Sequence, residues 1–199
     1  MKALKIVGIT LLALIVVAVV TVSFLSPKTY MERSITVNAP PASVLEEFSN
    51  FRKFNAWSPW SKMDPQAKYT FEGPESGVGA KMSWDGTESG KGSQETVAYE
   101  PGRRVKNLMK FEMMEGAMFS EIFVEAVPEG TKVTWTYDQD VSGTGPMNAA
   151  IGKFFGLNME GMMGPQYEDG LKAMKTIAEA NPEPEPAPVD STATEQPQQ

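Results

Sequence analysis

The chain has 199 residues, of which 41% are hydrophobic and 10% aromatic, enough for one folded domain with a sizeable core. It contains neither cysteine nor histidine, which excludes disulfides, thiolate and Ser-His-Asp catalysis, and the usual zinc ligands. A formal net charge of −7 disfavours nucleic-acid binding, which needs a basic surface. We therefore predict no metal, no cofactor and no nucleic-acid partner, and any catalysis would have to use carboxylates, lysine, tyrosine or ordered water.

Residues 6–25, IVGITLLALIVVAVVTVSFL, form a stretch of twenty residues without a charge. As a helix this stretch rises about 30 Å, the thickness of the hydrocarbon core of a bilayer. We predict that residues 1–27 are a single-pass transmembrane anchor, with a cleaved signal peptide as the alternative, although the apolar run exceeds the ~7–15 residues of a signal h-region. Lys2 and Lys5 precede it, and the positive-inside rule then favours a cytoplasmic N-terminus and an extracytoplasmic (periplasmic) domain.

Residues 28–180 have the pattern of a single domain. The alternation of polar and apolar residues in 34–38 predicts a strand, and a helix with Val44, Leu45 and Phe48 on one side follows from Pro41. A second short helix is expected over 51–57, ending before Pro59. Runs typical of strands, separated by glycine or proline turns, then cover 68–72, 80–84, 92–99, 103–112, 118–127 and 131–138.

The period of the pattern changes towards the C-terminus. Apolar residues recur three and four apart, which predicts a long amphipathic helix, at Met163, Tyr167, Leu171, Met174 and Ala178. Pro165 is expected to start this helix or to kink it, and the glycine-spaced segment 147–162 is expected to be a looser helix. Residues 181–199 contain five prolines and four acids, and predict a disordered acidic tail.

This order of elements predicts an α+β fold. It comprises a curved antiparallel sheet of about seven strands, two short helices after the first strand, and a long C-terminal helix across the concave face. A strongly curved sheet and a single helix rarely close completely, so a cavity between them is expected.

Several short segments of the sequence resemble the START-like (Bet v 1-like, helix-grip) superfamily, and within it the polyketide cyclase/dehydrase-type (SRPBCC) branch that is common in bacteria. The resemblance covers about residues 32–179. It rests on Ile35-Thr36-Val37 with Ala39-Pro40-Pro41-Ala42-Ser43-Val44, Phe54-Asn55-Ala56-Trp57-Ser58-Pro59-Trp60, Glu100-Pro101-Gly102-Arg103, Gly130-Thr131-Lys132-Val133-Thr134-Trp135 and Gly170-Leu171-Lys172.

The resemblance implies a deep apolar cavity beneath the C-terminal helix, which the superfamily uses to bind lipids, sterols, polyketides or hormones. We therefore expect a membrane-anchored module that binds an apolar small molecule or lipid, with residues 6–25 in the membrane. The residues expected to bind this ligand are Trp60, Trp84, Trp135, Tyr137, Phe155, Met159 and Met163. Trp57 is expected to fill the seam between helices and sheet, and Trp60 to lie at the cavity entrance.

Two other functions remain open from the sequence. The first is a cyclase or dehydrase that uses a carboxylate and a tyrosine inside the cavity. Glu121 is a candidate, although the alternation of its strand does not tell whether its face or that of Ser120 and Ile122 is the inner one. The second is an envelope interaction or stress protein recruited through the acidic tail. The sequence indicates neither an oligomeric state nor a particular ligand.

Overall fold

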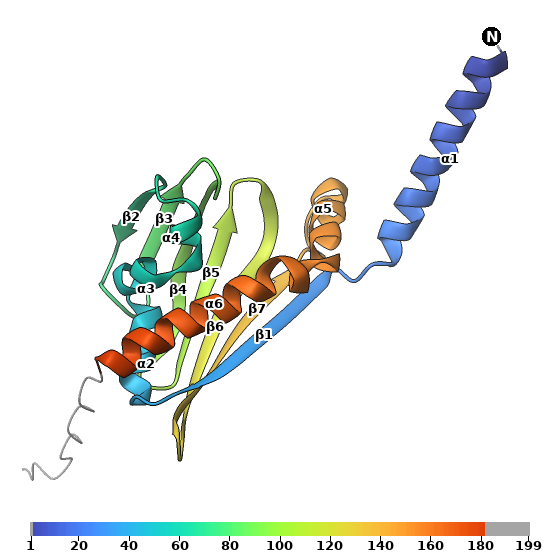
Figure 1. The fold of residues 1–199 in the computed structure, drawn as a ribbon. Helices are drawn as coiled ribbons and strands as arrows, with labels where there is room; N and C mark the ends of the chain where they lie inside the picture. Colours follow the sequence, from blue (N-terminus) through green and yellow to red (C-terminus); the bar gives the residue numbers. More distant parts are fainter. Residues whose placement is uncertain (1, 182–199) are drawn as a thin grey trace, which may run out of the picture.

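The computed structural model describes residues 2–181 of the chain (Figure 1). Within this range seven strands form one antiparallel sheet in the order β1-β7-β6-β5-β4-β3-β2. The strands are β1 (Lys28–Val37), β2 (Lys68–Glu72), β3 (Lys81–Asp85), β4 (Lys91–Glu100), β5 (Arg104–Phe111), β6 (Met114–Val127) and β7 (Gly130–Asp140). The first strand therefore lies at one edge, paired with the last, and β2 lies at the other.

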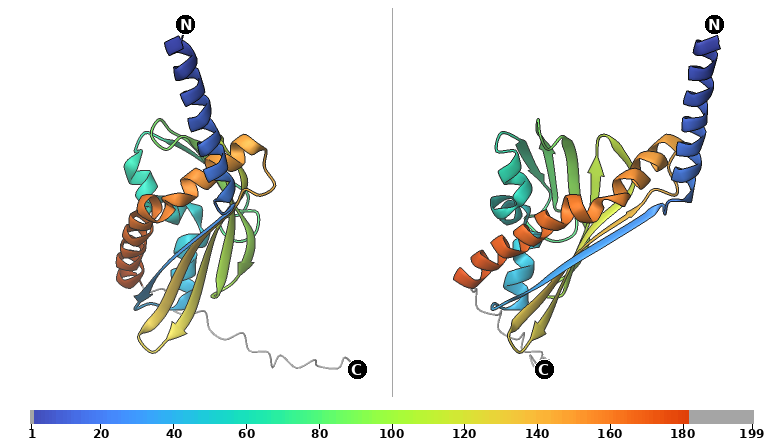
Figure 2. Two further views of the ribbon diagram at one scale, coloured as in Figure 1. Left: turned by 90° about the vertical axis from the view of Figure 1, so that its right-hand side faces the viewer. Right: turned by 45° about the vertical axis from the view of Figure 1, so that its right-hand side comes forward.

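The helices of residues 2–181 are α1 (Lys2–Phe24), α2 (Pro41–Ser49), α3 (Phe51–Trp57), α4 (Pro59–Met63), α5 (Pro146–Leu157) and α6 (Met159–Ala180). Of these, α2, α3, α4 and α6 cover the concave face of the sheet. The three views agree that α6 runs obliquely across the concave face, with α2, α3 and α4 beside it (Figures 1 and 2). The α+β helix-grip fold expected from the sequence is thus confirmed, whereas the predicted tail lies, from residue 182 on, outside the described residues.

One short helix was missing from the sequence prediction. Pro59 was expected to end the helical region, but α4 begins at it, with Ser58 as its N-cap residue. Proline is unfavourable in the interior of a helix because it lacks an N–H, yet it suits the first helical position, where that N–H has no partner anyway. The proline therefore separates α3 from α4 instead of leading the chain into the sheet.

The boundaries near the C-terminus also differ from expectation. The segment 147–162 was expected to form one loose helix, but it contains most of α5 and the first turn of α6, which are separated at Asn158. Pro165 lies inside α6, which continues through it, and Tyr167, Leu171 and Met174 are buried on the predicted apolar side. The strand β6 begins at Met114, four residues earlier than expected.

Trp57 lies where the sequence analysis placed it, in the seam between helices and sheet. Its side chain is only 2% exposed, and its indole N–H donates to the carbonyl oxygen of Glu47 at 3.3 Å. Its ring meets that of Phe48 edge to face at 5.2 Å between centroids. Burial of a large aromatic side chain stabilises the fold by about 2–3 kcal/mol, so Trp57 anchors α3 to α2 and the sheet.

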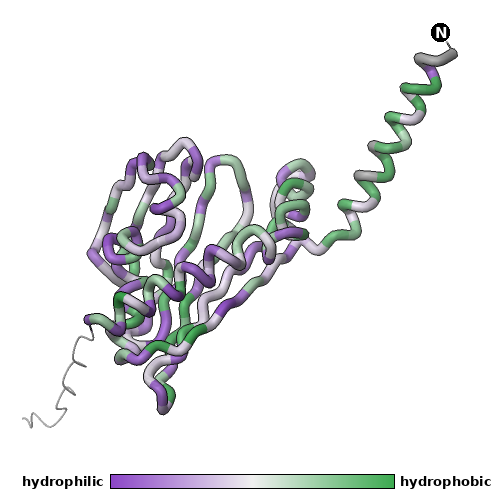
Figure 3. The backbone as a smooth tube through the Cα atoms, in the orientation of Figure 1, coloured by the Kyte–Doolittle hydropathy of each residue, from purple (hydrophilic) through white to green (hydrophobic). Residues whose placement is uncertain are grey.

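The N-terminal helix α1 projects away from the domain (Figures 1 and 3). The large apolar side chains described on it are exposed, among them Ile6, Leu12 and Phe24. Of the helices in residues 2–181, only α1 contains a segment, Lys5–Phe24, that is long and apolar enough to cross a membrane, a criterion that a signal sequence also meets. Only residues 25–27 separate α1 from β1.

Candidate functional site

A cavity of about 180 Å³ lies between the concave face of the sheet, the helices α3 and α4, and the first half of α6. The strands β2 to β7 all contribute to its walls, because the curved sheet wraps around it. The lining residues are Phe54, Ser58, Trp60, Ser61, Met63, Tyr69, Met82, Trp84, Ser89, Gln94, Met109, Phe111, Ser120, Trp135, Met163 and Tyr167.

The wall beneath the helices is a cluster of aromatic rings. Trp135 on β7 lies 4.1 Å from Tyr167 on α6, centroid to centroid, and Trp60 on α4 meets both rings edge to face at 5.8 and 5.9 Å. Edge-to-face and tilted pairs at these distances are attractive beyond their area burial. The aromatic cluster therefore fixes α4 and α6 against the sheet on one side of the cavity.

This apolar wall also contains a few neutral hydrogen-bonding groups. The indole N–H of Trp135 donates to the hydroxyl of Ser120 at 2.7 Å, and the Tyr167 hydroxyl also hydrogen-bonds to Ser120. Burial raises the pKa of Tyr167 well above its usual range, so the phenol stays neutral at any physiological pH. The cavity thus offers hydroxyl groups, but no charge, to a bound molecule.

None of the described residues that line the cavity is Asp, Glu, Lys or Arg. Glu121 lies on the outer face of β6, where its carboxylate pairs with Arg104 at 2.9 Å and with Lys106 at 3.2 Å. The inner face of that strand carries Ser120 and Ile122 instead. The cavity carboxylate that a cyclase mechanism would need is therefore not supplied by Glu121.

The side of the cavity at the β3–β4 turn is held in place by the carboxylate of Asp64, which does not itself line the cavity. Asp64, which directly follows α4, accepts hydrogen bonds from the backbone N–H groups of Glu88 (2.9 Å) and Ser89 (3.0 Å) and from the Ser89 hydroxyl (3.0 Å). These bonds hold the pKa of the Asp64 carboxyl below its usual range, and the bond from the Ser89 backbone N–H contributes most. Close by, Met63 is 56% exposed and forms part of the rim.

The structure brings together four of the seven residues that the sequence assigned to ligand binding. Trp60, Trp84, Trp135 and Met163 line the cavity. Tyr137 and Met159 are buried outside its lining, and Phe155 lies on α5, away from it. For all seven a role in binding stays a prediction.

Several lining residues were not assigned from the sequence. Met82, Met109 and Phe111 belong to alternating strands, and the pattern showed which residues share a face but not which stretch of that face would be hollow. Tyr167 follows Met163 by one helical turn and was predicted only as part of the buried side of α6. Helical spacing from Met163 was the one signal that could have placed it at the cavity.

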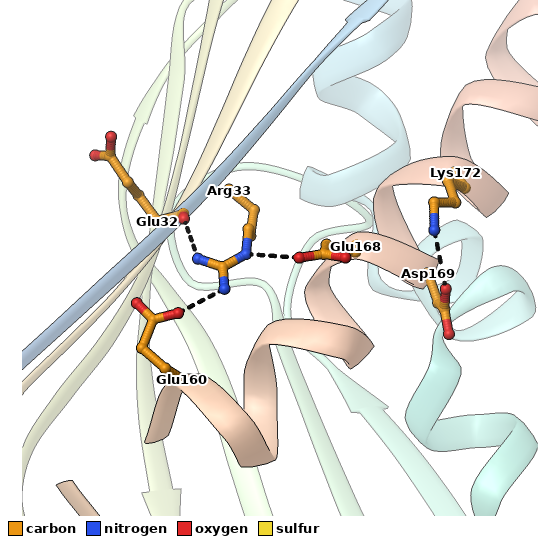
Figure 4. A network of polar contacts seen from close by, with 6 residues as sticks. All are labelled: Glu32, Arg33, Glu160, Glu168, Asp169 and Lys172. Atoms are coloured by element: carbon orange, nitrogen blue, oxygen red, sulfur yellow. Dashed lines mark hydrogen bonds and ion pairs between the residues drawn. The ribbon is translucent and has the colours of Figure 1, made fainter. Parts of the chain in front are cut away.

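The first half of α6, which roofs the cavity, is held to the sheet by Arg33 of β1 (Figure 4). The guanidinium donates to Glu168 at 3.0 Å, to Glu160 at 2.5 Å, and to the backbone carbonyl of Glu32 at 2.8 Å. One arginine therefore bridges two turns of α6 to the edge strand. In contrast, Lys172 and Asp169 pair only within α6, at 3.4 Å.

Comparison with known proteins agrees with this geometry. A family model described as "Polyketide cyclase / dehydrase and lipid transport" matches residues 28–179. A comparison with curated proteins gives no match.

Solved structures share the fold at low sequence identity. A protein from Chromobacterium violaceum superposes with a TM-score of 0.51 at 17% identity, covering 76% of this chain and 98% of its own. For Ara h 8.0201 the TM-score is 0.51 at 14% identity, with 77% and 99% covered. The di-domain ARO/CYC StfQ of the steffimycin biosynthetic pathway gives 0.52 at 12% identity, with 77% of this chain and 51% of StfQ covered. At these identities the likeness concerns the fold alone.

Proposed function

We propose, from the premise that this chain belongs to the polyketide cyclase / dehydrase and lipid transport family of the START-like (SRPBCC) superfamily, that it binds a neutral apolar molecule in the cavity beneath α6. Residues 6–25 anchor this binding module in a membrane. The N-terminus lies in the cytoplasm and the domain on the other side, as Lys2 and Lys5 ahead of the apolar stretch 6–25 favour.

The observation that carries the proposal is the chemical character of the cavity wall. Its large side chains are aromatic or methionine, and its polar groups are neutral hydroxyls and the amide of Gln94. A charged ligand would lose its hydration without gaining a countercharge, which costs several kcal/mol or more. An apolar ligand with one or two neutral polar atoms would gain both burial and a hydrogen bond. Methionine side chains adapt readily to apolar ligands of varied shape.

The volume of the cavity limits the size of the ligand. Cavities of roughly 150 Å³ hold a benzene ring, whereas sites for drug-sized molecules measure about 300–1,000 Å³. At about 180 Å³ this cavity accepts a single ring or the end of an acyl chain. A fused multi-ring molecule would require α4 to move away from the sheet.

The position of the cavity favours the membrane as the source of the ligand. The β3–β4 turn, whose Ser89 lines the cavity, lies at the same end of the domain as α5 and the root of α1 (Figures 1 and 2). An apolar molecule that leaves the bilayer beside α1 would therefore meet this end of the domain first.

The test uses the methyl groups of methionine as reporters in the full chain, reconstituted in lipid nanodiscs. Met82, Met109 and Met163 line the cavity, whereas Met31 and Met174 are buried elsewhere in the core and serve as internal controls. Titration with butylbenzene should shift the methyl resonances of the first three residues, because the aromatic ring would lie against them.

The charged analogue 4-butylbenzoate controls for the chemical class of the ligand and should leave all five resonances unchanged. Butylbenzene shifts of equal size at the lining and control methionines, or none at all, would refute the proposed binding site.

A further inference from the structure

The helix α5 has the reverse of the usual arrangement of a surface helix. Its glycines face the domain: a Cβ at Gly152 would clash with Val141, and one at Gly156 would clash with Thr29 of β1. The helix can lie this close to the sheet because both positions lack a side chain. The inward side of α5 therefore contributes almost no apolar burial.

The large apolar side chains of α5 point away from the domain. Met147, Ile151, Phe154 and Phe155 follow the spacing of one helical face, and Met147 and Phe154 are 73% and 67% exposed. A soluble domain would normally place such a stripe in its core, so this face requires an apolar partner.

The root of the proposed membrane anchor is next to this helix. The Lys153 ammonium of α5 donates to the backbone carbonyl oxygens of Val22 and Ser23, at 3.3 and 3.5 Å, in the last turn of α1. The Val22 carbonyl also accepts the backbone N–H of Leu25 at 3.2 Å. A cation suits this negative end of a helix dipole. Figure 3 shows the apolar residues of α5 beside the lower end of the apolar α1.

The connection between anchor and domain is too short to let the domain leave the membrane surface. Residues 25–27 alone separate α1 from β1, and three extended residues span about 10 Å. The headgroup layer of a bilayer is itself roughly 5–8 Å deep on each side. Elements packed against the last turn of α1 are thus held at the depth of the lipid headgroups.

We propose that α5 lies in the interface of the bilayer that holds α1, with the face formed by Met147, Ile151, Phe154 and Phe155 inserted among the lipid acyl chains. Lys153 lies at headgroup level, where a long basic side chain is favoured. The domain thereby gains a second membrane contact that fixes its orientation and directs its cavity end to the lipid surface. This inference rests on the proposed anchoring through residues 6–25.

The absence of native cysteine makes the test direct, because each nitroxide label can be attached to a single introduced cysteine in the full chain. The variants Ile151→Cys and Phe154→Cys place the label on the outer face of α5. Glu129→Cys places it in the exposed β6–β7 turn, separated from the anchored end by β7 of eleven residues, roughly 35 Å. Val16→Cys reports on α1 itself.

Each variant is reconstituted in phosphatidylcholine vesicles at a low protein-to-lipid ratio. The collision rates of the label with oxygen, which concentrates in lipid, and with a water-soluble nickel chelate are then compared. The oxygen-to-nickel ratio should be several-fold higher at residues 151, 154 and 16 than at 129.

The outcomes separate the two proposals. A lipid-exposed label at residue 16 together with water-exposed labels at 151 and 154 would overturn the α5 contact and leave the anchor intact. A water-exposed label at 16 would overturn both. Labels at 151 and 154 that are shielded from both reagents and show dipolar broadening would identify a second copy of the chain as the occupant, which also contradicts the bilayer contact.

Discussion

The two halves of the concave face differ in how completely they are filled. In the half beneath α2 and the C-terminal turns of α6, which we call the packed half, Val44, Phe48, Leu171 and Met174 are at most 2% exposed, and none of them lines the cavity. In the half beneath α4, which we call the hollow half, Met82, Trp84, Met109 and Phe111 surround the cavity. The same sheet therefore supports a solid core beneath α2 and the second half of α6, and a cavity where the five-residue helix α4 and the first half of α6 form the cover.

Removal of a ring from the packed half should have the largest effect. Phe48 is 1% exposed and contacts Trp57 and Trp135 edge to face at 5.2 and 5.3 Å, so Phe48→Ala leaves a void that its neighbours cannot fill. We expect the free energy of unfolding to fall by about 3–5 kcal/mol. Urea unfolding of the full chain in detergent micelles, followed by tryptophan fluorescence, measures this loss, and a change below 1 kcal/mol would contradict a solid packed half.

One substitution made in both halves should have opposite effects. Met174→Phe adds volume to a site that is 0% exposed and should destabilise the chain by about 1–3 kcal/mol. Met109→Phe adds the same volume next to the cavity and should leave stability unchanged or raise it by about 0.5–2 kcal/mol.

The Met109→Phe variant should also weaken the butylbenzene response at Met82, because the added ring occupies the site. If both phenylalanine variants lose stability equally in the same urea experiment, the distinction between the halves fails.

Acid should loosen the hollow half through Asp64. Its pKa is lower in the folded chain than in the unfolded one, because three hydrogen bonds to Glu88 and Ser89 favour the charged carboxylate. The contribution of Asp64 to stability is therefore complete above the ordinary carboxyl pKa of about 4 and is lost as the pH falls through the folded value.

Asp64→Asn should accordingly lower stability at pH 7 and flatten the dependence of stability on pH below about 4, measured by urea midpoints across that range. Asp85→Asn, which removes an exposed carboxylate of β3 that pairs with Lys91, is the matched control and should change neither quantity appreciably. Equal effects of the two variants would show that the β3–β4 turn is not held by Asp64.

The smallest effect on global stability is expected from breaking the ion pairs between Arg33 and the carboxylates of Glu160 and Glu168 on α6. Both carboxylates are more than half exposed, so Arg33→Ala should cost less than about 1 kcal/mol of global stability. Its local effect should be larger: amide hydrogen exchange in the first turns of α6, over the hollow half, should accelerate relative to the last turns. Lys172→Ala, on the same helix but without a contact to the sheet, should leave exchange unchanged.

The sequence predicted the class of fold and most strand positions because turns and alternation are local signals. The glycines and prolines between the strands and the spacing from Met163 to Ala178 required no knowledge of distant contacts. The start of α4 at Pro59 was not predicted, because a proline can mark either the end of one helix or the first position of the next, and the sequence does not distinguish the two. The separation at Asn158 lacked a comparable local signal.

The site was only partly predictable, because a cavity arises where side chains of the sheet and of the covering helices do not reach each other, and this depends on the tertiary structure. Trp60, Trp84 and Trp135 were expected to bind the ligand, and all three line the cavity. Tyr137 has the same alternation as Trp135 but lies two residues farther along β7, where the hydroxyl contacts Gln139 at 2.9 Å within the core. Alternation fixes the face of a strand, whereas the length over which that face is hollow depends on what covers it.

Under the proposed anchoring through residues 6–25, the three-residue connection between α1 and β1 determines how tightly the proposed ligand must be bound. A domain held within about 10 Å of a bilayer would meet molecules dissolved in that bilayer at a higher effective concentration than a domain free in solution. Occupancy is then reached with modest affinity, and a bound molecule can return to the lipid quickly. The proposed tether suits a local reservoir that exchanges with one leaflet, rather than a carrier that crosses the distance between two membranes.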